Sequence, residues 1–518
     1  MRSASGLGFW AANTRQRTLA ASVPATEASL VCLIAALTGA VFMSLALPKA
    51  NLTPLAPIGA AALFWAWFGL PPGRAFLVGW AAGAVYFGSA FSWFAETAGA
   101  YVAPFGFLLV AGPALLEGLA FGAAGALTAF AARRSRAGVA PLAAAAAFAA
   151  LEWLRSSGPL GLPFANLSYT QVESPLAPLA AFAGSFGVTF VLCVLAAYVA
   201  AAIRAPKRAD VGRATLVAIL CTLAAIAAAW TFWPARRVAA PTLRVAAIQG
   251  NIPQTMKWER STFDVSNERY ELLTRRAAAS HPALVLWPET VVTADLNLMP
   301  QLVARFGALA RSAHTELIVG SKQNTPAGEY NALYAFRPEG GLDAIYRKRV
   351  LVPFVEALPA SWLFGHLPVA SLVSRFGAGT SSGILDVGGM RFAPLICWES
   401  AFDGAAHGAM RDGAQAFLIA TDDAWFGTTA GPYQHAQIAQ MRALETGTWV
   451  VRAAATGISG IVAPNGRFTK IGPLERIAIV EGAVGAPQRS PYSALGAFPI
   501  GIALCVLYAG LAFGVRRP

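Results

Sequence analysis

The sequence predicts a polytopic α-helical membrane protein with one α/β domain inserted into it. The 518-residue chain is 56% hydrophobic and only 13% charged, which is too apolar for an ordinary soluble protein. Its apolar residues concentrate before about residue 233 and again after about residue 494. The stretch between these regions carries most of the acids, histidines and prolines. This distribution indicates a soluble domain held between membrane segments.

Eight mostly apolar runs are candidates for membrane spans, and most of them reach the ~20 residues that cross a bilayer as a helix. They lie at residues 28–47, 55–70, 75–94, 103–131, 138–154, 178–203, 214–233 and 494–515. The second and fifth are short, and the fourth is long enough to tilt. We therefore expect a tail at 1–27, a seven-span membrane domain at 28–233, a soluble domain at 242–486 and a C-terminal transmembrane helix at 494–515.

The distribution of Lys and Arg predicts the orientation, because positively charged loops stay in the cytoplasm. With the N-terminus inside, the cytoplasmic segments hold Arg2, Arg15, Arg17, Arg74, Arg133, Arg134, Arg136, Arg204, Lys207, Arg208, Arg213, Arg516 and Arg517. The opposite loops hold little beyond Lys49 and Arg155, with Arg236 and Arg237 just past the seventh span. We therefore expect both termini in the cytoplasm and the soluble domain outside it. The net charge of +13 reflects this topology and gives no reason to expect a nucleic-acid partner.

The first apolar run follows a long tail and lacks a convincing cleavage site, so we expect a signal anchor and no cleaved signal peptide. From about Thr242 to Ala486, short β-rich runs alternate with helical windows, which is typical of a layered α/β domain. The expected strands are Leu243–Gln249, Ala283–Trp287, Leu317–Gly320, Ala332–Phe336, Arg391–Ile396, Ala416–Ala420, Trp449–Ala453 and Ile477–Val480. The expected helices are Val265–Ala279, Leu302–Ala313 and Gln434–Glu445.

Three segments of this domain place a reactive side chain where a strand would run out into a loop. They are L-W-P-E-T with Glu289, Y-R-K-R-V with Lys348, and L-I-C-W-E with Cys397. Sites on α/β sheets usually form at such strand ends. A thiol needs a base to become a nucleophile, a carboxylate can accept its proton, and an ammonium can stabilise an oxyanion. Together the three residues make a candidate nucleophilic set.

Each member of this set also has a simpler explanation. Glu289 could be a first-turn acid of a helix, and Lys348 could be one charge of a solvated or headgroup-contacting face. Cys397 could be inert core. It is, however, the only cysteine outside a long apolar run, the others being Cys32, Cys193, Cys221 and Cys505. The order and local contexts of the three residues together favour the nucleophilic set.

These contexts resemble the Glu-Lys-Cys triad of the nitrilase (carbon–nitrogen hydrolase) superfamily, in W-P-E-T, in Lys348 ahead of L-V-P-F-V-E, and in I-C-W-E. A domain of this kind flanked by seven spans before it and one after it resembles, more closely, the bacterial apolipoprotein N-acyltransferase family. The resemblance covers nearly the whole chain. It extends to Q-G-N-I-P-Q with Lys257 and Trp258, to D-A-W-F-G followed by His435 and M-R-A-L-E, and to E-W-L-R at residues 152–155. It implies a nitrilase-like αββα sandwich for the soluble domain.

The resemblance also implies a function and a set of roles. Glu289 would be the base, Lys348 the oxyanion stabiliser and Cys397 the nucleophile that forms a thioester. Supporting residues would be Glu356, Glu399, Trp398 and Trp258. The acyl chain would come from a phospholipid, with phosphatidylethanolamine the expected donor, and the acceptor would be the diacylglyceryl-modified N-terminal cysteine of an apolipoprotein. The setting would be the bacterial inner membrane with the domain in the periplasm, and no cofactor or metal is expected.

Several positions depart from the family pattern. Trp398 stands where tyrosine is common, Val355 where glycine is usual, and Asp422 where asparagine is usual. The segment R-A-A-A-T-G at residues 452–457 lacks the typical asparagine. None of these changes removes the triad, but each could alter the fit of the acyl chain or the motion of a loop.

An apolar stretch punctuated by proline and glycine, Leu358–Val369, predicts a loop that dips toward the lipid. Trp362 and Phe364 would lie at the interface, where aromatic side chains settle, and the alternative is ordinary core under a long loop. Within the spans, Glu152 and Arg155 are spaced for a structural ion pair. Glu117 has no obvious partner, and we assign it no role.

Two other functions remain open from the residues. A membrane-anchored amidase or nitrilase would use the same triad with water in the second step, although seven spans exceed what an anchor requires. A transporter with an external binding domain would be expected to show two matching halves with broken helices and several intramembrane charges. A metal enzyme is not favoured, because the histidines lack ligand spacing, at His281, His314, His366, His407 and His435.

Overall fold

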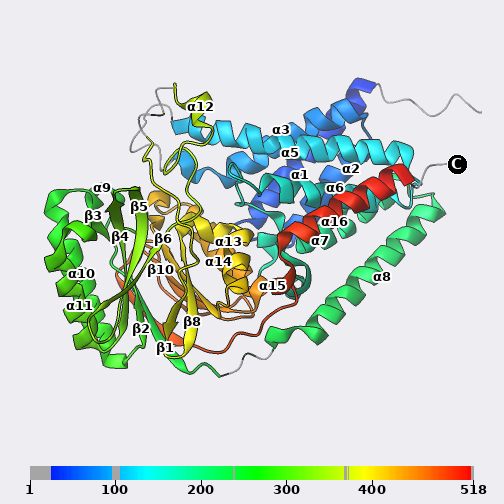
Figure 1. Ribbon diagram of the computed structural model, residues 1–518. Helices are drawn as coiled ribbons and strands as arrows, with labels where there is room; N and C mark the ends of the chain where they lie inside the picture. Colours follow the sequence, from blue (N-terminus) through cyan, green and yellow to red (C-terminus); the bar gives the residue numbers. More distant parts are fainter. Residues whose placement is uncertain are drawn as a thin grey trace, which may run out of the picture.

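The computed structural model describes residues 25–95, 106–236, 238, 240–366, 370 and 373–514. A bundle of long helices lies beside a domain built on two β-sheets (Figure 1). Most of the predicted tail, including Arg2, Arg15 and Arg17, lies outside the described residues, as do Arg237, Arg516 and Arg517.

Eight helices coincide with the eight apolar runs. They are α1 (Ala25–Ala46), α2 (Leu55–Phe68), α3 (Pro72–Ala90), α5 (Gly106–Arg134), α6 (Ala140–Arg155), α7 (Ala180–Arg204), α8 (Ala209–Phe232) and α16 (Ala497–Ala509), which continues into a π-helical turn at Gly510–Gly514. Among the described residues, five stretches are long and apolar enough to cross a membrane, in α1, α5, α7, α8 and α16. The helices α2, α3 and α6 are not in that group, so the count of eight spans stays a prediction.

Small residues allow these helices to pack closely, as is common in membrane bundles. A Cβ added to Gly83 of α3 would lie only 2.8 Å from the Cα of Gly118 in α5. The helix α7 is kinked at Gly184, whose φ of 63° is easily reached only by glycine. The ring of Tyr492, in the short helix α15 (Tyr492–Leu495), fills the space where a Gly184 side chain would be.

A buried charge cluster holds the end of α6. Arg155 Nη1 lies 3.2 Å from Glu117 Oε2, and Nη2 lies 3.9 Å from Glu152 Oε1. The predicted Glu152–Arg155 pair is therefore present, and Glu117 pairs with the same arginine because α5 packs against α6. Arg155 also donates to the carbonyls of Leu162 and Phe164, which fixes the segment that follows α6.

The soluble domain contains two sheets. The first has the order β13-β1-β2-β4-β5-β6 with β3 paired to β4, and comprises β1 (Leu243–Gln249), β2 (Leu284–Leu286), β3 (Val292–Asp295), β4 (Glu316–Thr325), β5 (Gly328–Phe336), β6 (Leu342–Arg347) and β13 (Ala478–Val484). The second has the order β12-β11-β10-β9-β8-β7, and comprises β7 (Leu385–Val387), β8 (Met390–Ile396), β9 (Ala416–Thr421), β10 (Trp449–Ala454), β11 (Gly460–Val462) and β12 (Phe468–Ile471). All eight predicted strands are present, with β1 at the predicted bounds.

Helices cover the outer face of each sheet. The helices α10 (Arg260–Ala277) and α11 (Pro300–Ala313) lie on the first sheet, and α13 (Asp403–Arg411) and α14 (Gly431–Thr446) lie on the second (Figure 1). The two sheets face each other across an apolar core that includes Val245, Phe392 and Val451. The αββα sandwich is therefore confirmed, and its α13–α14 layer faces the helical bundle.

The segment that was expected to be a loop contains one short helix, α12 (Ser361–Phe364), on an arm above the second sheet (Figure 1). Trp362 is 78% exposed there, which argues against its being ordinary core. The side chain of Phe364 and the residues Leu367–Val369 lie outside the described part of the chain.

Candidate active site

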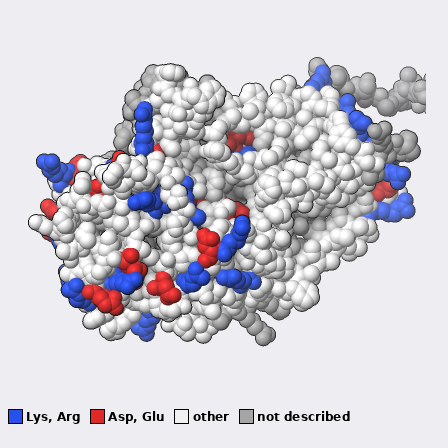
Figure 2. Space-filling view, viewed as in Figure 1, with Lys and Arg blue, Asp and Glu red and all other residues white. Residues whose placement is uncertain are grey.

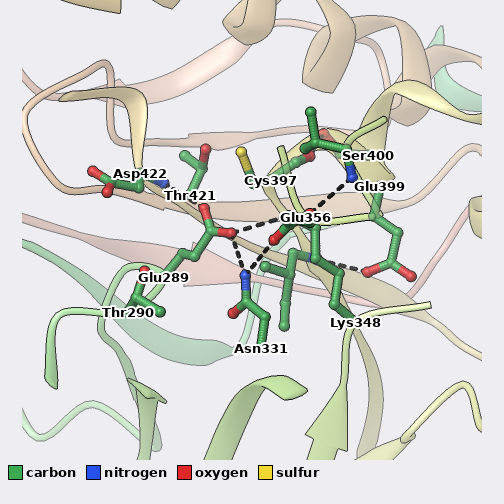
Figure 3. Close-up of polar contacts among 12 residues, drawn as sticks. Glu289, Thr290, Asn331, Lys348, Glu356, Cys397, Glu399, Ser400, Thr421 and Asp422 are labelled. Carbon is green, nitrogen blue, oxygen red and sulfur yellow. Dashed lines mark hydrogen bonds and ion pairs between the residues drawn. The ribbon is translucent and has the colours of Figure 1, made fainter. Parts of the chain in front are cut away.

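The three predicted reactive residues meet at one edge of the sandwich. Glu289 follows β2, Lys348 directly follows β6 and Cys397 directly follows β8. The strands β2 and β4 are parallel, and β6 runs the same way because it is separated from β4 by two antiparallel pairings. The carboxyl ends of these strands therefore converge, and Figure 3 shows the three side chains pointing toward one another. The expected clustering at strand ends is what the structure contains.

Lys348 is held between two carboxylates. Its Nζ donates to Glu289 Oε1 at 3.1 Å and to Glu356 Oε1 at 3.0 Å, and lies 2.9 Å from Glu356 Oε2. Asn331 of β5 links the same two acids, since its Nδ2 donates to Glu289 Oε1 at 2.7 Å and to Glu356 Oε1 at 2.9 Å. Each of these four side chains is at least nine-tenths buried. Contacts between protein side chains therefore orient both the base and the ammonium.

Cys397 lies at a sharp turn between β8 and a 3₁₀ helix formed by Cys397–Ala401. Its φ of 50° is in the left-handed region, where a residue other than glycine is strained. The strained turn pushes the sulfur out of the strand line, and Figure 3 shows it near Thr421 and the Glu289 carboxylate. Cys397 is partly buried and partly exposed, so its sulfur can reach a substrate.

The charges of the site keep it in one protonation state. Burial raises the pKa of Glu289, but the Lys348 ammonium, the Asn331 amide and Lys257 outweigh it and leave that pKa lowered. The pKa of Cys397 lies well above its ordinary value, because burial and the Glu289 charge outweigh the opposing effect of Lys348. Burial disfavours the Lys348 ammonium, yet the two glutamates raise its pKa overall. At neutral pH the resting site is therefore carboxylate, ammonium and thiol.

Glu399 anchors the turn that carries the nucleophile. Its Oε2 accepts from the Ile396 backbone N–H at 2.9 Å, and its Oε1 accepts from the Tyr346 hydroxyl at 2.7 Å and the Arg349 N–H at 3.1 Å. Burial raises the pKa of Glu399, and these hydrogen bonds partly counter the rise. The carboxylate thus ties the residue before Cys397 to the residue after Lys348, which is a positioning role.

A second network supports the nucleophile from behind. His435 of α14 places Nε2 3.2 Å from the Cys397 carbonyl oxygen and 2.9 Å from Ser400 Oγ, and Ser400 donates to the same carbonyl at 2.7 Å. His435 Nδ1 lies 2.9 Å from Asp423 Oδ1, and Arg452 pairs with Asp423 Oδ2 at 2.5 Å. Burial and the Arg452 charge lower the pKa of His435, so the imidazole is neutral at neutral pH. The network holds the backbone of the strained turn.

Lys257 and Asp422 flank the base. Lys257 Nζ lies 2.5 Å from Asp422 Oδ2 and 3.4 Å from the Glu289 carbonyl oxygen, and the Asp422 N–H donates to Glu289 Oε2 at 2.9 Å. Burial raises the pKa of Asp422 despite this pairing. Trp258 is half-exposed and lies over the ammonium groups of Lys257 and Lys322. Trp258 is therefore linked to Asp422 and Glu289 through Lys257.

The helical bundle also contributes to the site. Phe164, in the segment fixed by Arg155, stacks on Trp398 with ring centroids 5.2 Å apart and lies 5.8 Å from the His435 ring. Trp398 also packs against Phe402 at 5.9 Å. The residue after the nucleophile is thus enclosed by aromatic groups from both parts of the chain.

Sequence patterns missed several of these residues. Asn331 lies at the start of an apolar run, and Ser400 follows the nucleophile without any signature. Asp423 and Lys257 lie in motifs that indicate the family but no role for either residue. A polar residue within an otherwise apolar strand was the one available signal for Asn331. Among the described residues no cluster of three His, Cys, Asp or Glu side chains could hold a metal ion.

Comparison with protein families divides the chain as its fold does. Residues 244–484 match the carbon-nitrogen hydrolase family, and residues 39–198 match the apolipoprotein N-acyltransferase N-terminal domain. The first match covers the αββα sandwich and includes all three reactive residues. The second covers most of the bundle before it.

Full-length relatives are similar over nearly the whole chain. The apolipoprotein N-acyltransferase of Azotobacter vinelandii is 34% identical over 505 residues, which cover 93% of this chain and 95% of that protein. The enzymes of that name from Pseudomonas syringae pv. tomato and Methylococcus capsulatus are each 32% identical, over 92% and 94% of this chain and 95% and 96% of their own lengths. Among solved structures, Nit3 of Saccharomyces cerevisiae, a nitrilase-superfamily member, has a TM-score of 0.37 at 20% identity, covering 48% of this chain and 91% of its own.

Proposed function

The chain belongs to the apolipoprotein N-acyltransferase family, and from this membership we propose that Cys397, Glu289 and Lys348 transfer an acyl chain from a phospholipid to a lipoprotein through a cysteine thioester. The protein is a membrane-embedded acyltransferase. The acceptor is the free amino group of a diacylglyceryl-modified N-terminal cysteine, and phosphatidylethanolamine is the proposed donor.

In the first step, Glu289 accepts the thiol proton as the Cys397 sulfur attacks the ester carbonyl of the phospholipid. A C–S bond forms, and Lys348 stabilises the oxyanion of the tetrahedral intermediate. The C–O bond then breaks, and Glu289 returns the proton to the departing lysophospholipid oxygen. The product is an acyl-Cys397 thioester with the site in its original charge state.

In the second step, the amino group of the lipoprotein attacks the thioester carbonyl. Glu289 takes a proton from the attacking nitrogen, a C–N bond forms and the C–S bond breaks. The sulfur recovers its proton from Glu289, which restores the thiol. An α-amino group has a reference pKa of about 7.7–8.0, so a useful fraction of it is neutral near pH 7.

The observation that carries this proposal is the convergence of the three side chains. Lys348 Nζ lies 3.1 Å from Glu289 Oε1, and the strained Cys397 turn directs its sulfur toward the same carboxylate (Figure 3). The aromatic enclosure around Trp398 supports transfer over hydrolysis, because a thioester survives only where water is excluded. Glu356 acts through Lys348, and Glu399 acts through the turn that carries Cys397. Trp258 acts through Lys257.

Intact-protein mass spectrometry tests the proposal. The protein and its Cys397→Ser and Cys397→Ala variants are incubated with phosphatidylethanolamine, before and after a diacylated lipopeptide is added. We expect a hydroxylamine-labile acyl adduct only when Cys397 is present, and its loss as the lipopeptide gains one amide-linked acyl chain. The Cys397→Ala variant should acquire no adduct.

Two other outcomes would contradict the proposal. An adduct that water discharges as fast as the lipopeptide would indicate a membrane-anchored amidohydrolase. The absence of any adduct, with the protein folded, would remove Cys397 as the nucleophile.

A further inference from the structure

A cavity of about 840 Å³ lies where the soluble domain meets the helical bundle. Figure 2 shows this face of the molecule hollowed between the two parts. Its walls come from the end of α6, the start of α7, the start of α16 and the segment after Lys348, and include Trp153, Phe186, Phe498, Val350 and Leu358. These walls are mostly apolar, which suits an acyl chain.

The cavity adjoins the nucleophile turn. Its lining includes Ala401 and Phe402, which end that turn, and Phe402 packs on Trp398. It also includes Arg349, which bonds to Glu399 beneath the turn. A lipid in the cavity would therefore lie beside the segment that positions Cys397.

The residues that line the cavity include two with buried donors that lack acceptors. Arg442 of α14 and Asn166 are each only 1% exposed, and both line the cavity. Within the described part of the chain, neither Nε nor Nη1 of Arg442 forms a hydrogen bond, and neither does Nδ2 of Asn166. Buried donors without partners are costly, so an acceptor such as an ordered water or a ligand oxygen is expected beside them.

The neighbouring carboxylates do not satisfy these donors. Glu445 Oε2 lies 2.8 Å from Arg442 Nη2, which leaves the other nitrogens free of it. Asp403 Oδ1 is 3.7 Å from Arg442 Nη1, beyond hydrogen-bond distance, and Asp403 already accepts from the Tyr492 hydroxyl and the Ala497 N–H. The side-chain oxygen Oδ1 of Asn166 accepts from Arg155 Nη2 and Ser156 Oγ, so Nδ2 is the part of this side chain that stays unpaired among the described residues.

The position of these donors defines the ligand. They lie where α6 ends and α16 begins, at the end of the bundle that faces the soluble domain, which is where lipid headgroups meet water. Guanidinium and amide N–H groups match phosphate oxygens, and apolar walls beside them match acyl chains. A free anion would gain nothing from those walls.

We propose that Arg442 and Asn166 bind the phosphodiester group of the phospholipid acyl donor, and retain it on the lysophospholipid until that product leaves. The inference rests on the proposed function for the identity of this lipid as the donor. Binding the phosphate at a fixed point would set how far the ester can reach along the cavity toward Cys397, so the site would help to choose which ester is cleaved.

Binding to the full-length Cys397→Ala protein in detergent tests this site without catalysis. The probes are a lysophosphatidylethanolamine and a monoacylglycerol with the same acyl chain, which differ by the phosphate-bearing headgroup. We expect the lysophospholipid to bind at least about tenfold more tightly, the difference that one charge-assisted contact provides. Adding Arg442→Lys, which keeps a charge beside Glu445 but lacks the Nε donor, should bring the two affinities within about threefold.

Two further variants make the test decisive. Asn166→Asp keeps the oxygen that binds Arg155 and replaces the free amide with a repulsive carboxylate, so it should weaken lysophospholipid binding and leave monoacylglycerol binding unchanged. Arg467→Lys, at an exposed arginine in the soluble domain, is the matched control and should leave the preference intact. If the Arg442→Lys protein fails to fold, the lipid affinities of the Asn166→Asp protein alone decide whether the headgroup site exists.

The inference would be overturned if the Cys397→Ala protein bound the lysophospholipid no more tightly than the monoacylglycerol. It would also be overturned if this preference survived both Arg442→Lys and Asn166→Asp. Competition by inorganic phosphate at the affinity of the lysophospholipid would assign the site to a free anion and overturn it too. If the wild-type protein forms the thioester but the Cys397→Ala protein shows no preference for the lysophospholipid, only the headgroup site is refuted. If the preference is observed but no thioester forms, only the proposed function is refuted.

Discussion

At the scale of single residues, the site depends on groups that act through the triad. The Glu289 carboxylate bonds to Lys348, Asn331 and the Asp422 N–H, so both of its oxygens are oriented before substrate arrives. Such preorganisation lowers the cost of placing the base in the transition state. The residues that orient Glu289 should therefore affect acylation more than folding.

Asn331→Ala should slow thioester formation by about ten- to a hundredfold, the effect of losing one or two hydrogen bonds to a buried carboxylate. The change removes the amide that donates to both Glu289 and Glu356. Single-turnover acylation with phosphatidylethanolamine measures it. Asn324→Ala, at an exposed position on β4, is the control and should behave as wild type. Equal rates for the two variants would show that Asn331 does not orient the base.

The pH dependence should differ between the two steps. The pKa of Glu289 is lowered and that of Cys397 is raised well above its ordinary value, so the carboxylate–thiol form persists across neutral pH. Acylation should therefore be flat from about pH 5 to about pH 8.5. Aminolysis should fall about tenfold per unit below a pH of about 7.7, because only the neutral amine attacks. Single-turnover rates for each step measure this dependence. An acylation rate that changes with pH near pH 7 would contradict the proposed carboxylate–thiol form of Glu289 and Cys397.

The lowered pKa of Asp423 makes the stability of the fold depend on pH. Burial would raise this pKa, but Arg452 and His435 outweigh burial and lower it from 3.8 to about 2. The unfolded state therefore binds the proton more readily, so this contribution to stability is full above pH 3.8 and is lost as the pH falls toward 2. Protonation of Asp423, which would weaken its contact with His435 behind the Cys397 turn, should therefore occur only below about pH 3.8.

At the scale of elements, the segment between α6 and the 3₁₀ helix at Leu167–Gln171 joins the bundle to the site. Arg155 holds its backbone, and its Phe164 ring is fully buried between Trp93, Trp398 and His435. The segment therefore forms a wall of the active site although it belongs to the membrane part of the chain.

Phe164→Ala should cost about 3–5 kcal/mol of stability, as for other buried phenylalanines, and should also reduce acylation because Trp398 loses its stacking partner. Thermal unfolding in detergent and single-turnover acylation measure the two effects. Phe232→Ala, at a 72% exposed position on α8, should change neither. A Phe164→Leu protein with full stability and full activity would show that the aromatic wall has no part in the reaction.

The helix α12 carries Trp362 far from any packing core. Trp362→Ser should leave thermal unfolding unchanged, because the side chain is 78% exposed, and should slow acylation from phospholipid in bilayers about tenfold if the ring settles at the interface. Acylation by a detergent-dispersed donor should be unaffected. Leu298→Ser, 73% exposed in the soluble domain, is the matched control. A loss of stability without a change in bilayer activity would contradict the lipid-contact role.

How well the elements could be predicted depended on their local composition. The strand β1 is a continuous apolar run and was predicted at its true bounds, whereas β6 mixes Asp343 and Arg347 with apolar residues and was missed. Glu289, Lys348 and Cys397 were found because each has a local motif. The His435–Ser400 and Asn331–Glu289 contacts join residues 35 and 42 positions apart, and no local pattern encodes such distances.

At the scale of the whole molecule, the bundle and the sandwich share one apolar core. Trp398, Ile438, Met441 and Leu444 of the soluble domain belong to the same buried cluster as residues of α1, α2, α3 and α7. Ordinary domain interfaces are more polar than this, so we infer that the two parts act as one unit. A lipid would then enter beside the nucleophile turn through the interdomain cavity, without separation of the domains.

The arrangement of charge on this unit supports one orientation in the membrane. Figure 2 shows Lys and Arg side chains at the end of the bundle farthest from the soluble domain. The turn between α7 and α8, with Lys207 and Arg208, is at that end, whereas Lys49 and Arg155 lie near the soluble domain. Because positively charged turns stay in the cytoplasm, the soluble domain should be periplasmic.

Single-cysteine labelling tests this orientation in cells with a permeabilised outer membrane. In a protein whose five cysteines are replaced, Lys470→Cys on β12 and Lys207→Cys on the α7–α8 turn introduce matched exposed thiols. A membrane-impermeant maleimide should label the Lys470→Cys protein while the inner membrane is intact and the Lys207→Cys protein only after lysis, because a charged reagent cannot cross that bilayer. The reverse pattern would place the soluble domain in the cytoplasm, where the proposed reaction would require lipid and acceptor on that side. Labelling of both positions while the inner membrane is intact would mean that the charge asymmetry does not fix the topology.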